Sequence, residues 1–248
     1  MIGALIIGDE ILRGKREDKH LAKLIELLGA RGLRLDWAEY LGDSPELITA
    51  TLRRTLASGD IVFSFGGIGA TPDDHTRACA AAAAGVDLEL HPDAEAEMRA
   101  RFGSEINAFR LKMGEFPRGS AIIPNPYNRI PGFSLDDHHF VPGFPIMAWP
   151  MVEWVLDRRY AHLFNSRADA EASIIVYGLM ESTITPLMNE IEVRFRGAKT
   201  FSLPSIGDDG RRRHIELGVR GTPDQVSAAI AEIKAGVGAL GGNWEAQD

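Results

Sequence analysis

The sequence Ile-Val-Phe-Ser-Phe-Gly-Gly-Ile-Gly-Ala-Thr-Pro-Asp-Asp-His-Thr, residues 61 to 76, is the stretch around which the chain is organised. It begins with a short apolar run, which is typical of a strand buried on both faces. Three glycines follow, namely Gly66, Gly67 and Gly69. Because glycine has no Cβ, their peptide N–H groups can converge on an anion just before a helix. Asp73 and Asp74 then place two carboxylates where a metal–phosphate complex needs them.

The composition is that of an ordinary globular protein of 248 residues, 45% hydrophobic and 25% charged. The 27 basic and 35 acidic residues give a net charge of −8, which argues against a protein that binds nucleic acid by neutralising phosphates. Cys79 is the single cysteine, so an intramolecular disulfide and a cysteine-rich zinc site are excluded. The apolar run at residues 2–7 is too short to span a bilayer, and it lacks a secretory cleavage signal. We therefore expect a cytoplasmic protein that neither crosses nor binds a membrane.

Hydrophobic periodicity predicts strands that alternate with helices. The expected strands are 4–7, 33–37, 61–65, 86–90, 121–123 and 138–141, and the expected helices are 21–28, 45–58, 77–84, 92–102 and 151–156. Ser44-Pro45 supplies an N-cap followed by proline at the first helical position, and Gly85 stops the alanine-rich helix. This order predicts an α/β fold with a mostly parallel sheet and helices on both faces, which binds ligands beyond the carboxyl ends of the strands.

The chain is expected to form two domains. Residues 157–169 carry many charges and little apolar periodicity, which is typical of a linker. We place a first domain at residues 1–160 and a small α+β domain at residues 168–248. The second pattern consists of a strand at 174–177, a helix at 181–194, paired strands at 200–203 and 214–219, and a last helix that opens at Thr222-Pro223.

The unusual loops of the first domain all follow predicted strands, so they are expected to meet at one rim of the sheet. The candidate ligand-binding residues there are Gly8, Asp9, Glu10, Gly66, Gly67, Gly69, Thr71, Asn125, Pro142 and Gly143. A cleft with this many carboxylates needs a divalent cation before it can hold phosphate. The candidate metal ligands are Asp43, Asp73 and Asp74, and the expected metal is Mg²⁺, Mn²⁺ or Co²⁺.

Simpler interpretations stand beside this one. The three glycines can form a plain strand-to-helix turn, and the paired aspartates a solvated first helical turn that the helix dipole favours. The loop is not a Walker A motif, because no Lys-Ser/Thr pair follows, and Pro72 occupies the position of the third glycine of a Rossmann fingerprint. Cys79 sits in an alanine-rich helix as a small core residue, and His138-His139 point to opposite faces of a strand.

One alternative concerns RNA. Gly207-Asp208-Asp209-Gly210 fits the GXXG loop of KH domains in form. However, the loop precedes a strand, and its two acids would face any RNA phosphate. We therefore expect no nucleic-acid partner.

Several motifs together resemble one family. They are Gly8-Asp9-Glu10-Ile11-Leu12-Arg13-Gly14, Gly42-Asp43, the segment from Gly66 to Thr76, Asn125-Pro126, Pro131-Gly132-Phe133 and Pro142-Gly143-Phe144-Pro145. This set resembles the molybdopterin-binding MoaB/Mog domain, in the version found at the N-terminus of competence/damage-inducible protein A, called CinA-like. Gly178-Leu179-Met180-Glu181-Ser182 resembles the start of the smaller domain that follows in CinA-like proteins.

The resemblance implies a three-layer α/β/α domain that binds a nucleotide or a pterin phosphate. In molybdopterin adenylyltransferases of this superfamily, the aspartates that match Asp43 and Asp74 are the critical acids and Mg²⁺-ATP is the co-substrate, so these two are the candidate catalytic residues. CinA-like domains are associated with metal-dependent hydrolysis of ADP-ribose. The superfamily forms symmetric oligomers, which implies a homo-oligomer.

The chain departs from the CinA-like pattern at Ala70, where proline is usual. The amidase domain that often follows is not among the 248 residues, so amidase activity is not expected. We expect a protein that binds a phosphorylated ligand, either molybdopterin or a nucleotide such as ADP-ribose, and that hydrolyses or transfers at a pyrophosphate bond. The alternative is a molybdopterin- or nucleotide-binding protein without catalytic activity.

Overall fold

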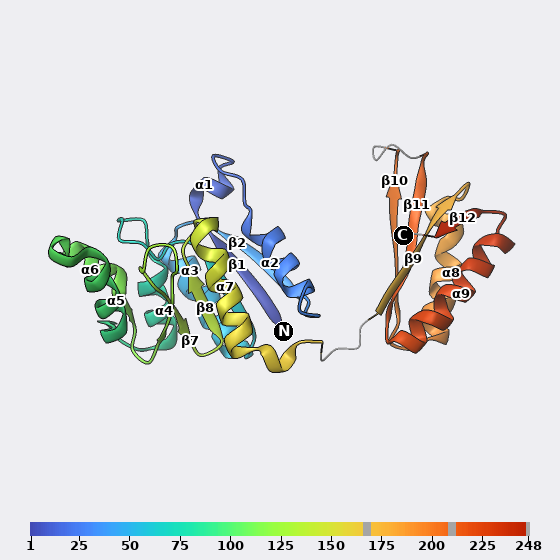
Figure 1. Cartoon of the computed structure of the whole chain (residues 1–248). Coiled ribbons are helices and arrows are strands. Elements are labelled where there is room, and N and C mark those ends of the chain that lie inside the picture. The colour runs from blue at the N-terminus through green and yellow to red at the C-terminus, as the bar shows by residue number, and fades with distance from the viewer. Residues whose placement is uncertain (166–169, 208–211, 247–248) are drawn as a thin grey trace. The chain divides into compact units, whose positions relative to one another are not determined.

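The computed structural model describes residues 1–165, 170–207 and 212–246. The chain divides into two compact units, residues 1–166 and residues 167–248 (Figure 1).

A six-stranded sheet forms the centre of the first unit, with the strand order β2-β1-β3-β8-β7-β6. Its strands are β1 (Ile2–Ile7), β2 (Trp37–Leu41), β3 (Ile61–Phe65), β6 (Ala121–Ile123), β7 (Gly132–Leu135) and β8 (His138–Val141). The first four strands in the sheet order are mutually parallel, and β7 runs antiparallel to both β8 and β6. The expectation of a mostly parallel sheet is confirmed.

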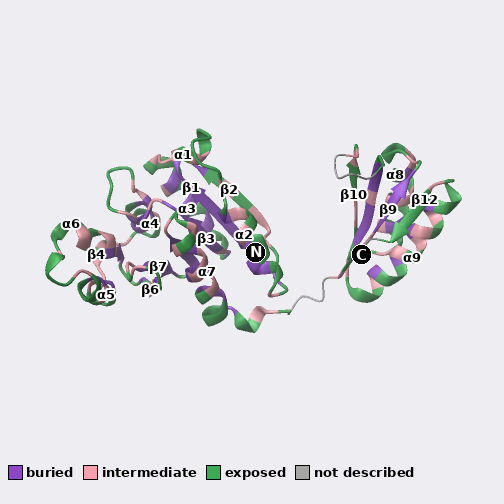
Figure 2. Cartoon of the chain, turned by 45° about the horizontal axis from the view of Figure 1, so that its top comes forward, coloured by how far each residue is buried: buried purple, intermediate pink, exposed green. Residues whose placement is uncertain are grey.

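Helices cover both faces of this sheet, which gives three α/β/α layers (Figures 1 and 2). They are α1 (Asp9–Leu12), α2 (His20–Gly29), α3 (Pro45–Ser58), α4 (Thr76–Ala84), α5 (Pro92–Phe102), α6 (Ala108–Leu111) and α7 (Pro145–Arg159), with single 3₁₀ turns at Gly103–Glu105, Lys112–Gly114 and Ala161–Leu163. The apolar sides of α2 and α7 pack on one face, and those of α3, α4 and α5 pack on the other.

The sequence of β1 explains why the strand lies at the centre. All six of its residues are buried, and their side chains alternate between the two cores. Ile2, Ala4 and Ile6 face α2 and α7, whereas Leu5 and Ile7 face α3 and α4. A strand that is apolar on both faces is stable only between two layers of helices.

Helix ends follow the expected local signals. The Ser44 hydroxyl accepts a hydrogen bond from the Leu47 amide at the start of α3, and Pro45 occupies the first turn. Gly85 closes α4 in the left-handed conformation, with φ of 70°. Both ends match the sequence expectation because they depend only on neighbouring residues.

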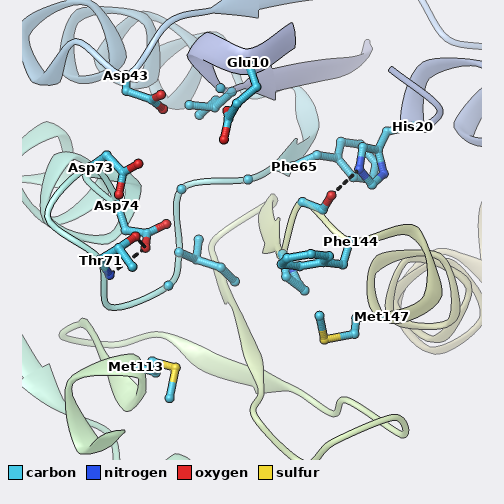
Figure 3. Close-up of a pocket in the computed structure, with 18 of the residues that line it drawn as sticks. Glu10, His20, Asp43, Phe65, Thr71, Asp73, Asp74, Met113, Phe144 and Met147 are labelled. Atoms are coloured by element: carbon cyan, nitrogen blue, oxygen red, sulfur yellow. Dashed lines mark hydrogen bonds between the residues drawn. The ribbon is translucent and has the colours of Figure 1, made fainter. Parts of the chain in front are cut away.

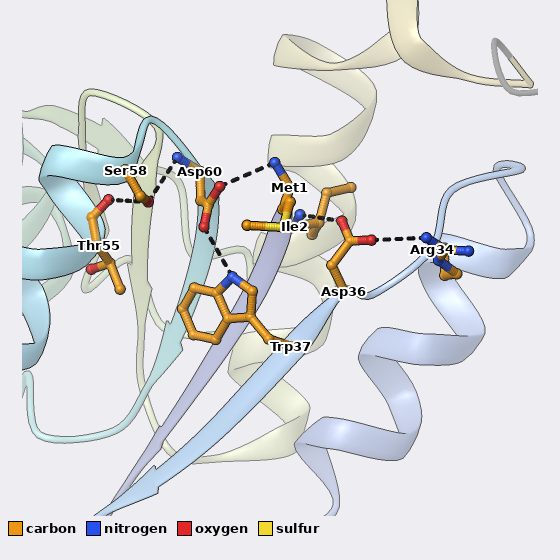
Figure 4. Close-up of polar contacts among 8 residues, drawn as sticks. All are labelled: Met1, Ile2, Arg34, Asp36, Trp37, Thr55, Ser58 and Asp60. Atoms are coloured by element: carbon orange, nitrogen blue, oxygen red, sulfur yellow. Dashed lines mark hydrogen bonds and ion pairs between the residues drawn. The ribbon is translucent and has the colours of Figure 1, made fainter.

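Polar contacts fix the amino ends of the parallel strands, opposite the carboxyl ends where the ligand is expected (Figure 4). The Asp60 carboxylate accepts hydrogen bonds from the Met1 ammonium at 3.1 Å and from the Trp37 indole at 3.0 Å. The Asp36 carboxylate accepts from the Ile2 amide at 2.8 Å. These contacts join β1, β2 and β3, so the loops at the far ends of these strands keep a defined register.

Some element boundaries differ from the sequence expectation. The predicted start of the second strand is wrong by several residues, because β2 begins at Trp37 and not at Leu33. The expected strand at 86–90 shortens to β4 (Leu88–Leu90), which pairs with β5 (Glu115–Pro117) in a separate two-stranded sheet.

The prediction that residues 157–169 form a linker is also partly wrong. The helix α7 starts at Pro145 and continues to Arg159, and the 3₁₀ turn at Ala161–Leu163 follows it. Tyr160 and the residues around it pack into the core of the first unit, so the charged stretch is structured up to that point.

The second unit is a four-stranded antiparallel sheet with two helices on one face. Its elements are β9 (Ala170–Tyr177), α8 (Glu181–Arg194), β10 (Lys199–Ser205), β11 (His214–Gly221), α9 (Pro223–Ala239) and β12 (Asn243–Ala246). The strand order is β10-β11-β9-β12. The expected small α+β fold is present, with β12 as an additional edge strand.

Two further expectations from the sequence concern the GXXG stretch and membrane-spanning segments. The GXXG stretch at 207–210 lies outside the described residues except for Gly207. Within the described parts of the chain, none of the helices is both long enough and apolar enough to cross a bilayer.

Candidate functional site

A cavity of about 430 Å³ lies beyond the carboxyl ends of β1, β3 and β8 in the first unit (Figure 3). The residues expected to form the site line it with one exception, and they are Gly8, Glu10, Asp43, Gly66, Gly67, Gly69, Thr71, Asp73, Asp74, Asn125, Pro142 and Gly143. Five segments far apart in the sequence therefore meet at one rim, as a parallel sheet requires.

The first two residues of α4 hold the glycine loop, which is defined here as residues 66–70, through four successive carbonyl groups. The Thr76 hydroxyl donates to Gly66 O at 3.1 Å, and the Thr76 amide donates to Gly67 O at 3.0 Å. The Arg77 Nε donates to Ile68 O at 3.1 Å, and its Nη2 donates to Gly69 O at 2.7 Å.

The amides of the loop point away from these tethers. In a trans peptide the N–H and the preceding C=O point in opposite directions. Fixing the carbonyls of residues 66–69 therefore turns the N–H groups of residues 67–70 away from α4. Among the described residues, no protein acceptor hydrogen-bonds these four amides. Four unpartnered donors on a cavity wall are suited to an anion.

Glycine is required at the start of this loop. Gly66 has φ of 100° and Gly67 has φ of 69°, which side-chain-bearing residues rarely adopt. A Cβ at Gly66 would lie 2.3 Å from Ile7 O, and a Cβ at Gly67 would lie 2.2 Å from the Thr76 Oγ1. Both contacts are too close, so the tethered conformation depends on these two residues.

The acids occupy one side of the loop (Figure 3). Asp74 Oδ2 accepts hydrogen bonds from the Thr71 amide at 2.8 Å and the Thr71 hydroxyl at 2.5 Å. Asp43 Oδ2 accepts from the Asp9 amide at 2.9 Å. Burial raises the pKa of Asp43, and the negative charges of Asp9, Glu10 and Asp73 raise it further, against the hydrogen bond from Asp9.

Asp9 is the exception among the expected ligand-binding residues, because it does not line the cavity. Its Oδ1 accepts from the Asp43 amide at 3.3 Å, and its Oδ2 pairs with Arg13 at 2.5 Å. Asp9 and Asp43 thus exchange backbone contacts that join α1 to the end of β2. The role of Asp9 in this structure is to position Asp43.

The carboxylates are not arranged as a complete set of metal ligands. Within the described residues, no group of three or more His, Cys, Asp or Glu side chains is arranged to hold a metal ion. Mg²⁺ in phosphate sites commonly uses only one or two carboxylates, with water and substrate oxygens as the remaining ligands. The acids therefore fit a cation that is shared with a bound phosphate and do not fit a resident one.

The opposite side of the cavity is apolar. Phe144 and Met147 lie across the glycine loop from the carboxylates, and Met113 lies on a third side (Figure 3). Phe144 is half exposed at the start of α7. The sequence does not signal this wall, because its members come from α7 and from the segment after α6.

His20 is a further residue that sequence reasoning missed. Its Nε2 lies 3.2 Å from Gly143 O, and its ring stacks on Phe65 with centroids 4.6 Å apart. Burial lowers the pKa of His20, so the ring is neutral and donates through Nε2 to the carbonyl. The contact joins residues 123 positions apart in the chain, so no local pattern reveals it.

The other rim residues serve the shape of the site. The Asn125 side chain donates to Ile130 O and accepts from the Tyr127 amide, so it holds the loop between β6 and β7. Arg16 lines the cavity and has no ion-pair partner among the described residues.

Comparison with known proteins shows which family the first unit resembles. The family described as "Probable molybdopterin binding domain" matches residues 3–162. A CinA-like protein from an Anaeromyxobacter species is 30% identical over 242 residues, which cover 88% of this chain and 58% of that protein. A CinA-like protein from Syntrophotalea carbinolica is 31% identical and covers 78% of this chain. The chain spans 50% of the length of the latter protein.

Among solved structures, the crystal structure of the protein CinA with unknown function from Thermoplasma acidophilum is similar. The TM-score is 0.58 at 27% sequence identity, and the match covers 63% of this chain and 96% of that one. The resemblance inferred from the motifs is confirmed. The chain belongs to the molybdopterin-binding MoaB/Mog domain family, in its CinA-like branch.

Proposed function

We propose that this protein binds a phosphorylated ligand in the cavity, either molybdopterin or a nucleotide such as ADP-ribose, and hydrolyses or transfers at its pyrophosphate bond. The observation that carries the proposal is the set of four unpartnered amides at residues 67–70, held in place by α4. Their direction supports a phosphate on the loop. The apolar wall at Phe144 and Met147 suits the ring system of such a ligand.

The residues of the chain have separate roles in this proposal. The loop amides bind the phosphate oxygens and stabilise charge that develops on the transferred group. Asp43, Asp73 and Asp74 hold a divalent cation, Mg²⁺, Mn²⁺ or Co²⁺, together with the ligand. When bound, the cation neutralises phosphate charge. Asp74 also keeps the turn at residues 71–74 closed through its two bonds from Thr71.

A second candidate is a molybdopterin- or nucleotide-binding protein without turnover. It shares the anion-binding loop with the first candidate, so the two differ only in whether bound ligand is converted. We propose a homo-oligomer in both cases, by analogy with the family.

The test is incubation of the purified protein with ADP-ribose or ATP and Mg²⁺, Mn²⁺ or Co²⁺, beside thermal shifts with the same compounds. Metal-dependent product supports the enzyme. A ligand-induced shift without product supports the binding protein, and neither response contradicts both candidates.

Asp74→Asn is the informative variant, because an amide oxygen can still accept from Thr71 while the charge is lost. We expect turnover to fall by at least about 100-fold, as for other groups that stabilise transferred charge, with an unchanged melting temperature. Asp87→Asn is the matched control, since Asp87 is exposed, pairs with Arg118 and lies outside the cavity. Full activity in Asp74→Asn would exclude a catalytic role for this carboxylate.

A further inference from the structure

Arg77 is a buried cation directly behind the glycine loop. It is the second residue of α4, and only 7% of its surface is exposed. Within the described parts of the chain, its guanidinium donates to four backbone carbonyls and to no side chain. Two of them, Ile68 O and Gly69 O, belong to the loop, and the other two, Lys112 O and Glu115 O, belong to the segment that carries Met113.

The contacts on the far side keep the guanidinium in place. The group is planar, and its N–H donors form a rigid fork. Nη1 reaches the Lys112 and Glu115 carbonyls while Nε and Nη2 reach the loop, so both edges of the plane are held. Rotation away from the loop would break bonds on both edges. The peptide planes at residues 68–70 therefore inherit the fixed orientation of Arg77.

The charge of Arg77 is not neutralised by a direct ion pair. Among the described residues, no carboxylate lies within ion-pair distance of its guanidinium, and Glu115 and Asp74 act on its charge only from a longer distance. Carbonyl dipoles solvate the charge but do not cancel it. Burial of an unpaired cation is costly, and an anion on the opposite side of the loop would offset that cost.

We propose that Arg77 is a positioning residue of the anion site, which aims the amides of Gly69 and Ala70 into the cavity and adds a full positive charge behind them. The inference rests on the proposed function, since it assumes that the loop binds an anion. It predicts that the site discriminates by charge, with a dianionic tetrahedral group preferred to a monoanionic one of the same shape. The amides alone provide geometry, and Arg77 provides the additional dependence on ligand charge.

Sulfate and perchlorate test this directly, because both are tetrahedral and carry two charges and one charge, respectively. Titration of ¹⁵N-labelled protein with each salt, at constant ionic strength and a constant concentration of Mg²⁺ so that the acids of the cleft are neutralised, gives the affinities from the shifts of the loop amides. For the wild type we expect sulfate to bind at least about tenfold more tightly than perchlorate, from the Coulomb interaction of a buried charge with a nearby anion.

Two substitutions separate charge from geometry. Arg77→Gln removes the charge, so the ratio of sulfate to perchlorate affinity should fall by about tenfold or more. Arg77→Lys keeps the charge but cannot make the forked contacts. It should weaken both anions while leaving their ratio within about threefold of the wild type. The control is Arg99→Gln, which makes the same charge change on the exposed side of α5, where Arg99 pairs with Glu95.

The outcomes are distinct. If sulfate does not shift the wild-type loop amides, the proposed function fails at its first step. If sulfate binds the wild type but Arg77→Gln weakens both anions equally, Arg77 is only structural and the inference is wrong. If Arg77→Gln does not fold, Arg77→Lys is the remaining test. A ratio of sulfate to perchlorate affinity near one in Arg77→Lys would contradict a role for the charge.

Discussion

At the scale of single residues, Asp43 is a carboxylate whose pKa is raised, because burial and the neighbouring acids disfavour its charge. The sequence predicted its place, because it follows a strand that ends at the rim. It did not predict that Asp43 lines the cavity and Asp9 does not. Each carboxylate accepts a hydrogen bond from the other residue's amide, and the two acids look alike in sequence. For the same reason Arg77 and His20 were missed, because their partners are carbonyls of distant segments.

The raised pKa of Asp43 predicts a pH dependence of cation binding. A divalent cation binds the carboxylate and competes with its proton. Because the folded pKa lies above the ordinary aspartate value, cation-dependent ligand binding should be complete above that pKa. It should decline as the pH falls, at a higher pH than for an ordinary aspartate. Calorimetric titration of Mn²⁺ in the presence of ADP-ribose, from pH 7.5 to 5, measures this.

Asp43→Asn should remove the cation dependence at every pH, while Asp87→Asn should keep the wild-type profile. A wild-type affinity that is constant over this range would show that Asp43 does not take part in cation binding.

At the scale of elements, segments with a cap, a proline stop or a clear apolar period were predictable, and short strands without such a signal were not. The ends of α3 and α4 follow from Ser44, Pro45 and Gly85, because caps act within one turn. The strand β7 has four residues and β5 has three, which is too few for a period to be recognised. These strands form by pairing with partners elsewhere in the sheet or in the chain, which local patterns do not contain.

The buried histidines of β8 lead us to expect that the folded protein loses stability in acid. His138 and His139 are buried on opposite faces, where they bond Thr55 and the pair Ser134 and Tyr160. Burial lowers the pKa of His138 from 6.5 to about 4. The unfolded chain therefore binds a proton between these pH values and the folded one does not. The stability from His138 is present above pH 6.5 and is lost as the pH falls towards 4.

The shift of His138 corresponds to about 3 kcal/mol of unfolding free energy. Urea unfolding at pH 7.5 and 5 should reveal a loss of about 2 kcal/mol, because the full loss is reached only below the folded pKa of about 4. His138→Gln, whose amide can still contact Thr55, should reduce the difference between the two pH values. The matched control is His162→Gln, which replaces an exposed histidine and should not change it. If His138→Gln and His162→Gln lose the same free energy of unfolding between pH 7.5 and 5, His138 is not responsible for the acid sensitivity.

At the scale of the whole molecule, the cavity belongs to one unit. Every residue that lines it lies between Ile6 and Met147, within the unit of residues 1–166. The sequence anticipated a mostly parallel sheet and a rim site, since the alternation of strands with helices predicts parallel strands whose carboxyl ends lie at one edge. It could not anticipate the cavity walls, because those depend on how α7 and the segment around Met113 pack.

A fragment of residues 1–166 should therefore bind the ligand as the full chain does. The measurement is ADP-ribose affinity by calorimetry, and we expect values within about threefold, since no lining residue is removed. A fragment that folds, as judged by circular dichroism, but binds far more weakly would show that the second unit contributes to the site. Light scattering of the same fragment tests whether residues 167–248 carry the proposed oligomer contact.

The tethered carbonyls of the glycine loop have a consequence for how this site changes over evolution. Its donors are main-chain atoms, and their direction is set by Thr76 and Arg77. Substitution at Ala70 changes a side chain but leaves the amides in place, as long as the new residue carries an N–H. Under the proposed function, substitutions at Ala70, Phe144 or Met147 would therefore change the side chains around the ligand while the main-chain donors for its phosphate stay in place.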